Sequence, residues 1–406
     1  MYNNIDIFTK ALGIESPWQL DRVEFDKEKG RLDLFISYEK GTEFPCKKCE
    51  QKSSIYDTTD KRTWRHLNFF QYEAYIHCEI PRIDCDEHGV LQVEVPWSRP
   101  RSGFTLLFEA FVIELVSAMS VKEAADLVGE HDTRLWRVVK YYVEKARREE
   151  DFSEVKDVGI DETSCKKGHN YVTLFVDLSQ GKTLYVTEGK DALTIDEFVL
   201  SLKAHNGDIN NIENVCCDMS PAYIKGAKRN FPNAKLTYDK FHVMKKINEA
   251  VDEVRREERK ENEELNKTRY IWLKNYENLT KKQEKKYRSL KDKNLKTVRA
   301  YNMKLALKDF WDIEDITDAS VYLQKWYLWA RKSRLEPMKE VGAFIKRNWR
   351  GIIQYTQTRI NNGILEGINS VIQTVKRKAR GFRNVDNFIT AIYLRCGKLE
   401  FDLPEV

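Results

Sequence analysis

Four potential metal ligands early in the chain restrict how its first segment can fold. They form two pairs, Cys46 with Cys49 and Cys85 with His88, and each pair has two residues between its members. This spacing lets one tight turn present two ligands to the same tetrahedral ion, and thiolates with an imidazole are ligands typical of zinc. We therefore expect a closed, structural zinc site. The nearby residues that could replace one of these ligands are His66, His77 and Cys78.

The segment around these ligands has a β-rich pattern. Apolar Leu32, Leu34 and Ile36 alternate with other residues, and residues 72–78 form a second strand-like run. A small β module of this kind gains stability from a bound ion. Proline and glycine between residues 96 and 103 end the pattern. The sequence therefore predicts a zinc-binding, β-rich module over residues 1–97.

Helical periodicity follows from Phe104. A short helix is expected over 121–128, because Ser120 and Glu123 have the spacing of a capping box and Gly129 is a helix-ending residue. A helix, a tight turn and a basic helix in this order are typical of a DNA-reading helix-turn-helix, although any small helical bundle has the same pattern. We predict such a domain over residues 104–150. Its expected DNA contacts are Arg134, Arg137 and Lys140.

Strands and helices alternate between residues 155 and 240. We expect strands at 158–163, 171–177, 183–186 and 214–217, and helices at 195–204 and 221–229. About 110 residues after Phe241 carry almost no strand signal, and 253–296 is dense in charge, as in solvated helices. A last helical pattern begins at Asn362, is interrupted at Gly381 and resumes over 385–394.

Two acids lie in the strand-like runs of this region. Asp161 belongs to the first run, where alternation puts Glu162 on the opposite face. Asp218 directly follows the apolar run 215–217 and precedes a helix, a position that α/β sheets use for functional residues. Two such acids on neighbouring strands would hold divalent cations with hard oxygen ligands. For Asp218, the alternative is that it only caps the following helix.

A third acid, Glu366, opens the last long helix. The buried stripe of that helix is expected to include Leu365, Ile368, Ile372 and Val375. The adjoining stripe carries Glu366, Asn369, Gln373, Lys376, Arg377 and Arg380. A carboxylate followed by cations suits an acid at a metal with a basic tail along a phosphate backbone, although a solvated helix face has a similar pattern.

In this order, these segments resemble the DDE-type transposases of bacterial insertion sequences, specifically the ISL-three family, over nearly the whole chain. Besides the zinc and helix-turn-helix segments, the similar motifs are 159–162, 218–220, 239–243, 365–369 and 376–382. One departure is His88, where the family more often has a fourth cysteine. Histidine ligates zinc equally well.

The resemblance implies an α+β multidomain protein with a ribonuclease-H-like α/β catalytic domain over 155–406, which contains an all-helical insertion at about 245–350. Trp272, Trp326 and Trp329 are expected in the core of that insertion rather than against DNA. The catalytic triad implied by the family is Asp161, Asp218 and Glu366, holding two Mg²⁺ or Mn²⁺ ions.

The implied DNA contacts from this domain are His242, Lys376, Arg377 and Arg380. Asp239 and His242 resemble a further Asp-x-x-His signature of related transposases, whose role the residues leave open. The histidine would orient a scissile phosphate or a flipped base, or the pair would simply cap the following helix.

The implied function is a transposase that binds the terminal inverted repeats of its element in double-stranded DNA. It would cleave DNA with Mg²⁺ and transfer the freed strand to a target, working as a homodimer on DNA. One alternative is a nuclease or junction resolvase without strand transfer. Another is a zinc-containing DNA-binding regulator without chemistry, which would leave the three acids unexplained together.

Composition sets broad limits on these interpretations. The net charge of +5, from 69 basic and 64 acidic side chains, is too slight to identify a nucleic-acid binder by itself. No run of 18 apolar residues is present, and the opening residues lack a basic stretch followed by an apolar one. We therefore expect a cytoplasmic protein, associated with the nucleoid if the resemblance holds, whose eight cysteines form no disulfides.

Overall fold

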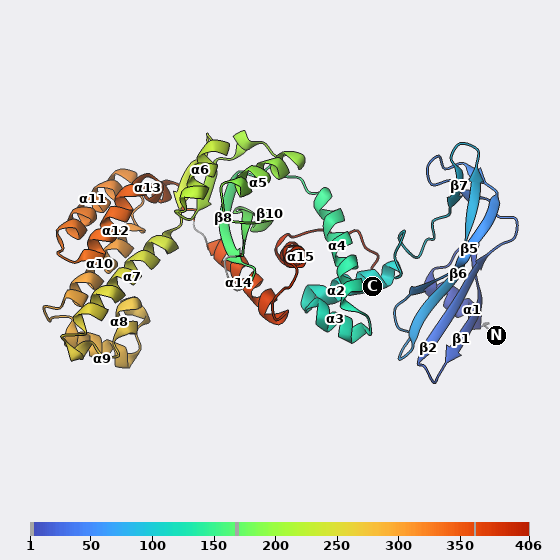
Figure 1. Ribbon diagram of the computed structural model, residues 1–406, viewed down its shortest axis with the longest axis horizontal. Helices are drawn as coiled ribbons and strands as arrows, with labels where there is room; N and C mark the ends of the chain where they lie inside the picture. Colours follow the sequence, from blue (N-terminus) through green and yellow to red (C-terminus); the bar gives the residue numbers. More distant parts are fainter. Residues whose placement is uncertain (1–3, 167–169, 361–362, 406) are drawn as a thin grey trace. The chain divides into compact units, whose positions relative to one another are not determined.

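The computed structural model describes residues 4–166, 170–360 and 363–405, so the expected outer limits at 1 and 406 and the expected helix start at Asn362 lie outside the described residues. The chain forms two compact units, Met1–Glu144 with Glu400–Val406, and Lys145–Leu399 (Figure 1). The boundary lies within helix α4 (Asp132–Arg148). The expected zinc module and most of the expected helix-turn-helix therefore belong to one unit.

The first unit contains a mixed five-stranded sheet. Its strands are β1 (Trp18–Asp26), β2 (Arg31–Tyr38), β5 (Ile55–Arg65), β6 (Glu73–Cys85) and β7 (Gly89–Gln92), in the order β1-β2-β6-β5 with β7 on β6. Helix α1 (Asn4–Leu12) precedes them, and β3 (Phe44–Pro45) pairs with β4 (Lys52–Ser53). Leu32, Leu34 and Ile36 are buried on the inner face of β2, so the predicted alternation is confirmed.

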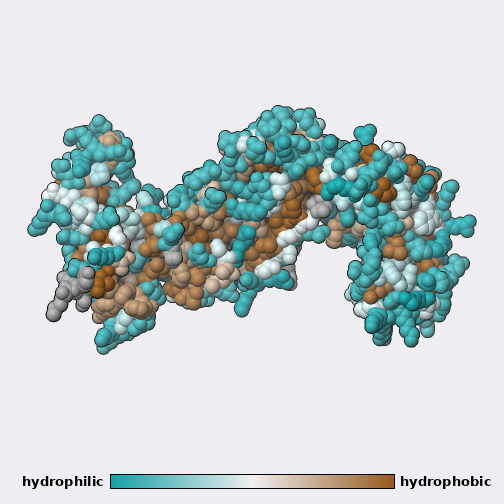
Figure 2. Space-filling view, turned by 180° about the vertical axis from the view of Figure 1, so that it is seen from behind, coloured by the Kyte–Doolittle hydropathy of each residue, from teal (hydrophilic) through white to brown (hydrophobic). Residues whose placement is uncertain are grey.

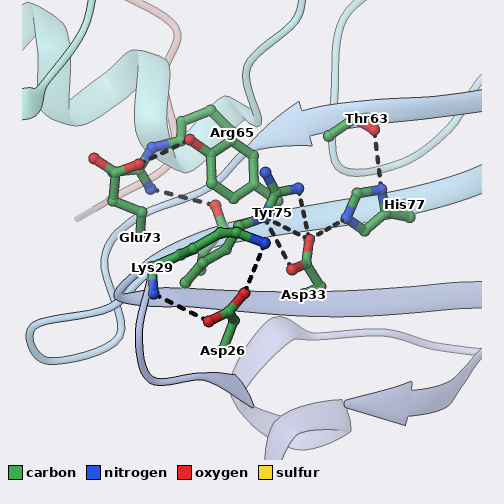
Figure 3. A network of polar contacts seen from close by, with 10 residues as sticks. Asp26, Lys29, Asp33, Thr63, Arg65, Glu73, Tyr75 and His77 are labelled. Carbon is green, nitrogen blue, oxygen red and sulfur yellow. Dashed lines mark hydrogen bonds and ion pairs between the residues drawn. The ribbon is translucent and has the colours of Figure 1, made fainter. Parts of the chain in front are cut away.

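A polar network covers part of the outer face of this sheet (Figure 3). His77 lies between two partners, with its Nε2 2.5 Å from Asp33 Oδ1 and its Nδ1 2.9 Å from Thr63 Oγ1. Arg31 donates to the same Asp33 carboxylate at 2.7 Å, and the ring of Phe35 stacks on His77. Both nitrogens of this buried imidazole are therefore engaged within the sheet.

Three helices follow the sheet: α2 (Leu106–Ala118), α3 (Val121–Val128) and α4. The capping box of Ser120 and Glu123 is present, and Gly129 adopts a left-handed conformation with φ of 71°, which confirms the predicted limits of the short helix. Glu109 on α2 is fully buried. Its carboxylate accepts hydrogen bonds from Arg99 Nε, Ser102 Oγ and Tyr142 Oη, and so joins the preceding segment, α2 and α4.

The second unit contains another five-stranded sheet, in the order β10-β9-β8-β11-β12. Its strands are β8 (Asp157–Ser164), β9 (Tyr171–Asp177), β10 (Lys182–Glu188), β11 (Asn214–Cys217) and β12 (Lys235–Tyr238). Strands β8, β9 and β10 are antiparallel neighbours, whereas β11 runs parallel to both β8 and β12. The four strands predicted in this region are confirmed as β8 to β11, and the four-residue strand β12 was not predicted.

Helices α5 (Leu193–Ala204) and α6 (Pro221–Asn230) lie on the opposite side of this sheet from α14 (Gly363–Lys378) and α15 (Val385–Cys396) (Figure 1). Ile160 on β8 shares a core with Phe198 of α5. The adjacent Gly159 faces α14, where an added Cβ would lie 2.9 Å from a methyl group of Leu365. Glycine at this position therefore permits the close approach of α14 to β8.

The interval between β12 and α14 is helical. Its helices are α7 (Lys240–Glu258), α8 (Arg269–Leu273), α9 (Lys281–Leu290), α10 (Lys296–Phe310), α11 (Ile316–Lys332), α12 (Glu336–Arg347) and α13 (Trp349–Thr358). In the part of this interval that the structure describes, 240–360, no strand occurs. Hydrophilic side chains cover much of its visible surface (Figure 2).

The three tryptophans of this interval differ in their environments. Trp272 and Trp326 are buried as expected, and their ring N–H groups donate to Thr268 Oγ1 and the Met303 carbonyl. The expectation of a core position was wrong for Trp329, which is 44% exposed because the buried stripe of α11 passes through Trp326 and Ala330. None of the helices in the described residues is long and apolar enough to cross a membrane.

Candidate zinc site and active site

The structure brings the four predicted zinc ligands together. Cys46 and Cys49 lie on the turn between β3 and β4, and Cys85 and His88 lie on the turn between β6 and β7. The ligand atoms all lie within 4.8 Å of one another, with 3.7 Å between Cys49 Sγ and Cys85 Sγ and 3.8 Å between Cys46 Sγ and His88 Nδ1. A tetrahedral zinc ion, with bonds of about 2.0 to 2.3 Å, separates its ligands by roughly these distances.

Local backbone geometry prepares these side chains for a cation. The backbone N–H groups of Lys48 and, to a lesser extent, Cys49 lower the pKa of the Cys46 thiol to about 6. This shift favours the thiolate of Cys46, which is the form that binds metal. The tight turn is closed by Glu50, whose N–H donates to the Cys46 carbonyl at 2.7 Å.

The three possible substitute ligands lie outside this cluster and have other surroundings. His77 is held by Asp33 and Thr63, as described above. His66 Nδ1 contacts Thr105 Oγ1 at 2.9 Å, and burial lowers its pKa to about 4. Burial raises the pKa of the Cys78 thiol to about 12, so this side chain is a neutral part of the core.

The three basic residues of α4 that we predicted to contact DNA differ in their partners and in their exposure. Arg134 forms an ion pair with Glu130, and its guanidinium lies 4.2 Å from the centre of the Phe104 ring. Arg137 is exposed and Lys140 is half-buried. Arg134 is therefore engaged by neighbouring side chains, although 41% of its own side chain remains exposed.

Three aspartates meet at one edge of the second sheet. The parallel register pairs Gly159 of β8 with Cys216 of β11, and continuing it brings Asp218 opposite Asp161. Strand β11 likewise pairs Cys217 with Tyr238 of β12, so Asp239 follows on the next strand, and its N–H donates to the Cys217 carbonyl at 3.1 Å. Residues opposite each other on parallel strands point to the same face.

These aspartates form a concentrated negative charge. Burial raises the pKa of the Asp161 carboxyl to about 6, and the neighbouring carboxylates of Asp239 and Asp218 add to the shift. Asp161 Oδ1 accepts the N–H of Glu162 at 2.8 Å. Asp218 Oδ1 accepts the Ser220 N–H at 2.8 Å and so closes the turn before α6, but the helix cap expected as its alternative is absent, because Ser220 is the N-cap of α6 and has no side-chain cap bond. Carboxylates that repel one another in this way favour a bound cation.

Asp239 and His242 form a hydrogen-bonded pair beside this edge. Asp239 Oδ1 accepts the Phe241 N–H at the start of α7, and its Oδ2 lies 2.9 Å from His242 Nδ1. The hydrogen bond to Asp239 raises the pKa of His242, and the charges of Asp239, Asp218 and Asp161 act in the same direction. Asp239 therefore caps α7, as the structural alternative expects, and also orients the His242 imidazole; contact of His242 with a phosphate or a base stays a prediction.

Glu366 is exposed in the first turn of α14, the helix that packs against β8. Three residues of the polar stripe predicted on this helix contact β8. Asn369 Nδ2 donates to Asp161 Oδ2 at 2.6 Å, Gln373 Nε2 donates to Thr163 Oγ1 at 2.9 Å, and Lys376 Nζ donates to the Ser164 carbonyl at 2.7 Å. Glu366 lies one helical turn before Asn369 on this stripe.

The three basic side chains that we predicted to contact DNA at the end of α14 differ in their surroundings. Lys376 is engaged by Ser164, whereas Arg377 and Arg380 are exposed. Sequence reasoning missed that Asp239 directly follows a third parallel strand, and it missed the contact of Asn369 with Asp161. The short alternating run before Asp239 was an available signal for the first. The second depends on the register between a helix and a strand 208 positions apart.

We predict that the protein co-purifies with about one equivalent of zinc. Cys49→Ser should release it, unfold the first unit around the two turns and abolish DNA binding by that unit, because three remaining ligands hold the ion poorly. Elemental analysis and circular dichroism measure these effects.

The matched control is Cys78→Ser, which alters a buried thiol of the same sheet outside the ligand cluster. This variant should retain its zinc. A zinc-free parent protein with an intact first unit and undiminished DNA affinity would contradict the zinc assignment.

Three family models match successive parts of the chain. A zinc finger of the IS204/IS1001/IS1096/IS1165 transposases matches residues 42–88, and the helix-turn-helix domain of the ISL3 transposase family matches 93–143. An ISL3 transposase model matches 158–392. Together with the Cys/His cluster, the first match supports a structural zinc, and the second identifies a DNA-binding helix-turn-helix.

Known transposases are similar to the chain over almost their whole length. The transposase of insertion sequence IS1557 from Mycobacterium tuberculosis is 26% identical, over 99% of this chain and 97% of the relative. The transposase of IS1001 from Bordetella parapertussis is 26% identical, over 94% of this chain and 96% of the relative. Because the transposase model also matches more than half of the chain, this protein belongs to the ISL3 family of transposases.

Proposed function

We propose that this protein binds the terminal inverted repeats of its insertion sequence, cleaves the DNA there in a Mg²⁺-dependent reaction, and transfers the freed strand to a target. The observation that carries this proposal is the strand register that puts Asp161 and Asp218 side by side, with the Glu366 helix packed over the same strand. We further propose that this sheet is a ribonuclease-H-like catalytic fold and that helices α7 to α13 are an insertion in it.

The chemistry of the donors fits divalent cations. Asp161, Asp218 and Glu366 supply hard, anionic oxygens of the kind that Mg²⁺ and Mn²⁺ prefer. A buried amide oxygen, Asn369 Oδ1, is also close to Asp161 and has no hydrogen-bond partner among the residues that the structure describes. When bound, the ions would neutralise charge on the scissile phosphate and activate the attacking oxygen.

The chain's own residues have distinct parts in this scheme. Asp161, Asp218 and Glu366 would hold the cations, which would supply the charge that positions the phosphate. His242 is oriented by Asp239, which also favours its charged form, and it contacts a phosphate oxygen of the DNA strand that is cleaved. Water attacks during cleavage, and the freed 3′-hydroxyl attacks during strand transfer, so no covalent protein intermediate is required.

DNA outside the reacting phosphate is held by other surfaces. We propose that α4 of the helix-turn-helix reads the inverted repeat with Arg137 and Lys140, with Arg134 supporting the helix through Glu130. Arg377 and Arg380 at the end of α14 contact the phosphate backbone, while Lys376 stabilises the end of β8. We propose a homodimer on DNA, since two element ends must be joined, and action in the bacterial cytoplasm at the nucleoid.

We predict that Asp161→Asn, Asp218→Asn and Glu366→Gln each remove cleavage and strand transfer together. Loss of one ligand removes several kcal/mol of transition-state stabilisation, which corresponds to about 1,000-fold in rate. Binding to the element end should change little, because it depends on cations elsewhere. Labelled element ends, incubated with and without Mg²⁺, report both activities, and a gel-shift assay reports binding.

Glu162→Gln is the matched control, since it removes the neighbouring carboxylate of the same strand, and its effect should be mild. Cleavage by Asp161→Asn at the parent rate would refute the assignment. Cleavage without strand transfer by the parent protein would instead favour a nuclease or resolvase, and binding without either reaction would favour a regulator.

The raised pKa of Asp161 gives a second prediction, on stability. Its folded pKa of about 6 lies above the unfolded value of 3.8, so folding favours the protonated carboxyl. The ionised group therefore lowers the free energy of unfolding above pH 6, and this penalty disappears below about pH 4. Without divalent cations at pH 7.5, Asp161→Asn should be more stable than the parent by up to about 3 kcal/mol, since each pKa unit corresponds to about 1.4 kcal/mol.

Thermal melting in Mg²⁺-free buffer measures this difference, with zinc left in place. The gain should shrink as the pH falls towards 4, and added Mn²⁺ should raise the melting temperature of the parent but not of the variant. A variant that is less stable than the parent at every pH would contradict the conclusion that the ionised, buried carboxylate of Asp161 destabilises the folded protein.

A further inference from the structure

We propose that Asn369 is a further residue of the cation site, where its amide nitrogen orients Asp161 and its amide oxygen is a neutral ligand for a divalent cation. The inference rests on the proposed function, since it concerns the same cations. It adds to the three acids a residue whose chemistry differs from theirs.

The first observation is the hydrogen bond to Asp161. The amide atom of Asn369 that lies 2.6 Å from Asp161 Oδ2 is a donor, because an oxygen at that distance from an ionised carboxylate would be repelled. Asp161 Oδ1 accepts the Glu162 N–H from its own strand. Each carboxylate oxygen thus accepts one bond, which fixes its orientation and leaves lone pairs for a cation.

The second observation is the other end of the same amide. Asn369 Oδ1 is buried and meets no hydrogen-bond donor in the described segments 4–166, 170–360 and 363–405. A buried acceptor without a partner costs about 1–3 kcal/mol. An amide oxygen is also among the ligands that Mg²⁺ and Ca²⁺ accept from proteins. A cation bound beside Asp161 would satisfy this oxygen.

A purely structural role explains less. The position of α14 on β8 is already fixed by apolar and polar contacts that do not involve Asn369. Leu365 meets Gly159, Ile372 is buried, and Gln373 and Lys376 donate to Thr163 and Ser164. Packing alone therefore does not require an amide at position 369, whose nitrogen meets Asp161 and whose oxygen meets no donor among the described residues.

The test is Mn²⁺ binding by the full-length, zinc-containing protein without DNA, measured by titration calorimetry and by the electron paramagnetic resonance of free Mn²⁺. Asn369→Leu should weaken Mn²⁺ binding by about 10-fold or more, as loss of a residue supporting a metal site does. The rise in melting temperature on adding Mn²⁺ should be smaller than in the parent, whereas a purely structural role predicts an equal rise.

Gln373→Leu is the matched control, because it removes the next amide of the same stripe, which contacts a threonine rather than a carboxylate. Its Mn²⁺ affinity should stay within about twofold of the parent value. Asn369→Asp keeps an oxygen but loses the donor to Asp161, so its metal-free form should be less stable than the parent and should regain stability in Mn²⁺.

The outcomes separate this inference from the function on which it rests. If the parent binds Mn²⁺, Asp161→Asn does not, and Asn369→Leu binds like the parent, only the assignment of Asn369 is overturned. If the parent binds no Mn²⁺, or if Asp161→Asn binds it undiminished, both the cation site and the role of Asn369 are overturned.

Discussion

The parallel pairing of β11 with β8 on one side and β12 on the other is the interaction on which the candidate active site depends. Parallel strands end at the same edge of a sheet, so the residues that follow them meet there. In this chain those residues are Asp218 and Asp239, and the register brings Asp161 of β8 alongside. A shift of one residue on β11 would turn Asp218 to the other face.

Bringing these acids together has a cost that the rest of the site reduces. Burial and like charges raise the pKa of Asp161, and the imidazole of His242 partly offsets the effect. The amide of Asn369 and the backbone N–H of Glu162 hold the carboxylate in one orientation. The arrangement is nevertheless better suited to a protein with bound cations than to one without, which is why metal binding and stability are linked in this account.

Much of this organisation could be predicted from the sequence. The spacing of Cys46, Cys49, Cys85 and His88 predicts two turns that bind one ion, and the short apolar runs predict strands β8 to β11. The helical character of the interval after β12 followed from its lack of strand signal.

The remaining features depend on tertiary contacts. Arginine and lysine are the residues that usually contact DNA phosphates. Arg134 instead pairs with Glu130, and Lys376 donates to Ser164. No local sequence pattern distinguishes a basic side chain used inside the protein from one that is free to contact DNA. Strand β12 has only four residues, so its pattern is weak without its neighbour β11. Asn369 stood out only as a member of a polar stripe, because its partner Asp161 lies 208 positions away.

The central claim is that Asp161, Asp218 and Glu366 jointly bind the divalent cations that act on DNA. Anomalous diffraction from crystals of the full-length protein grown with Mn²⁺ and an uncleaved element end tests it most directly. The account predicts Mn²⁺ peaks bonded to oxygens of Asp161 and of at least one other of these acids, next to a backbone phosphate. Mn²⁺ bound elsewhere beside the DNA, with all three carboxylates free of metal, would contradict it.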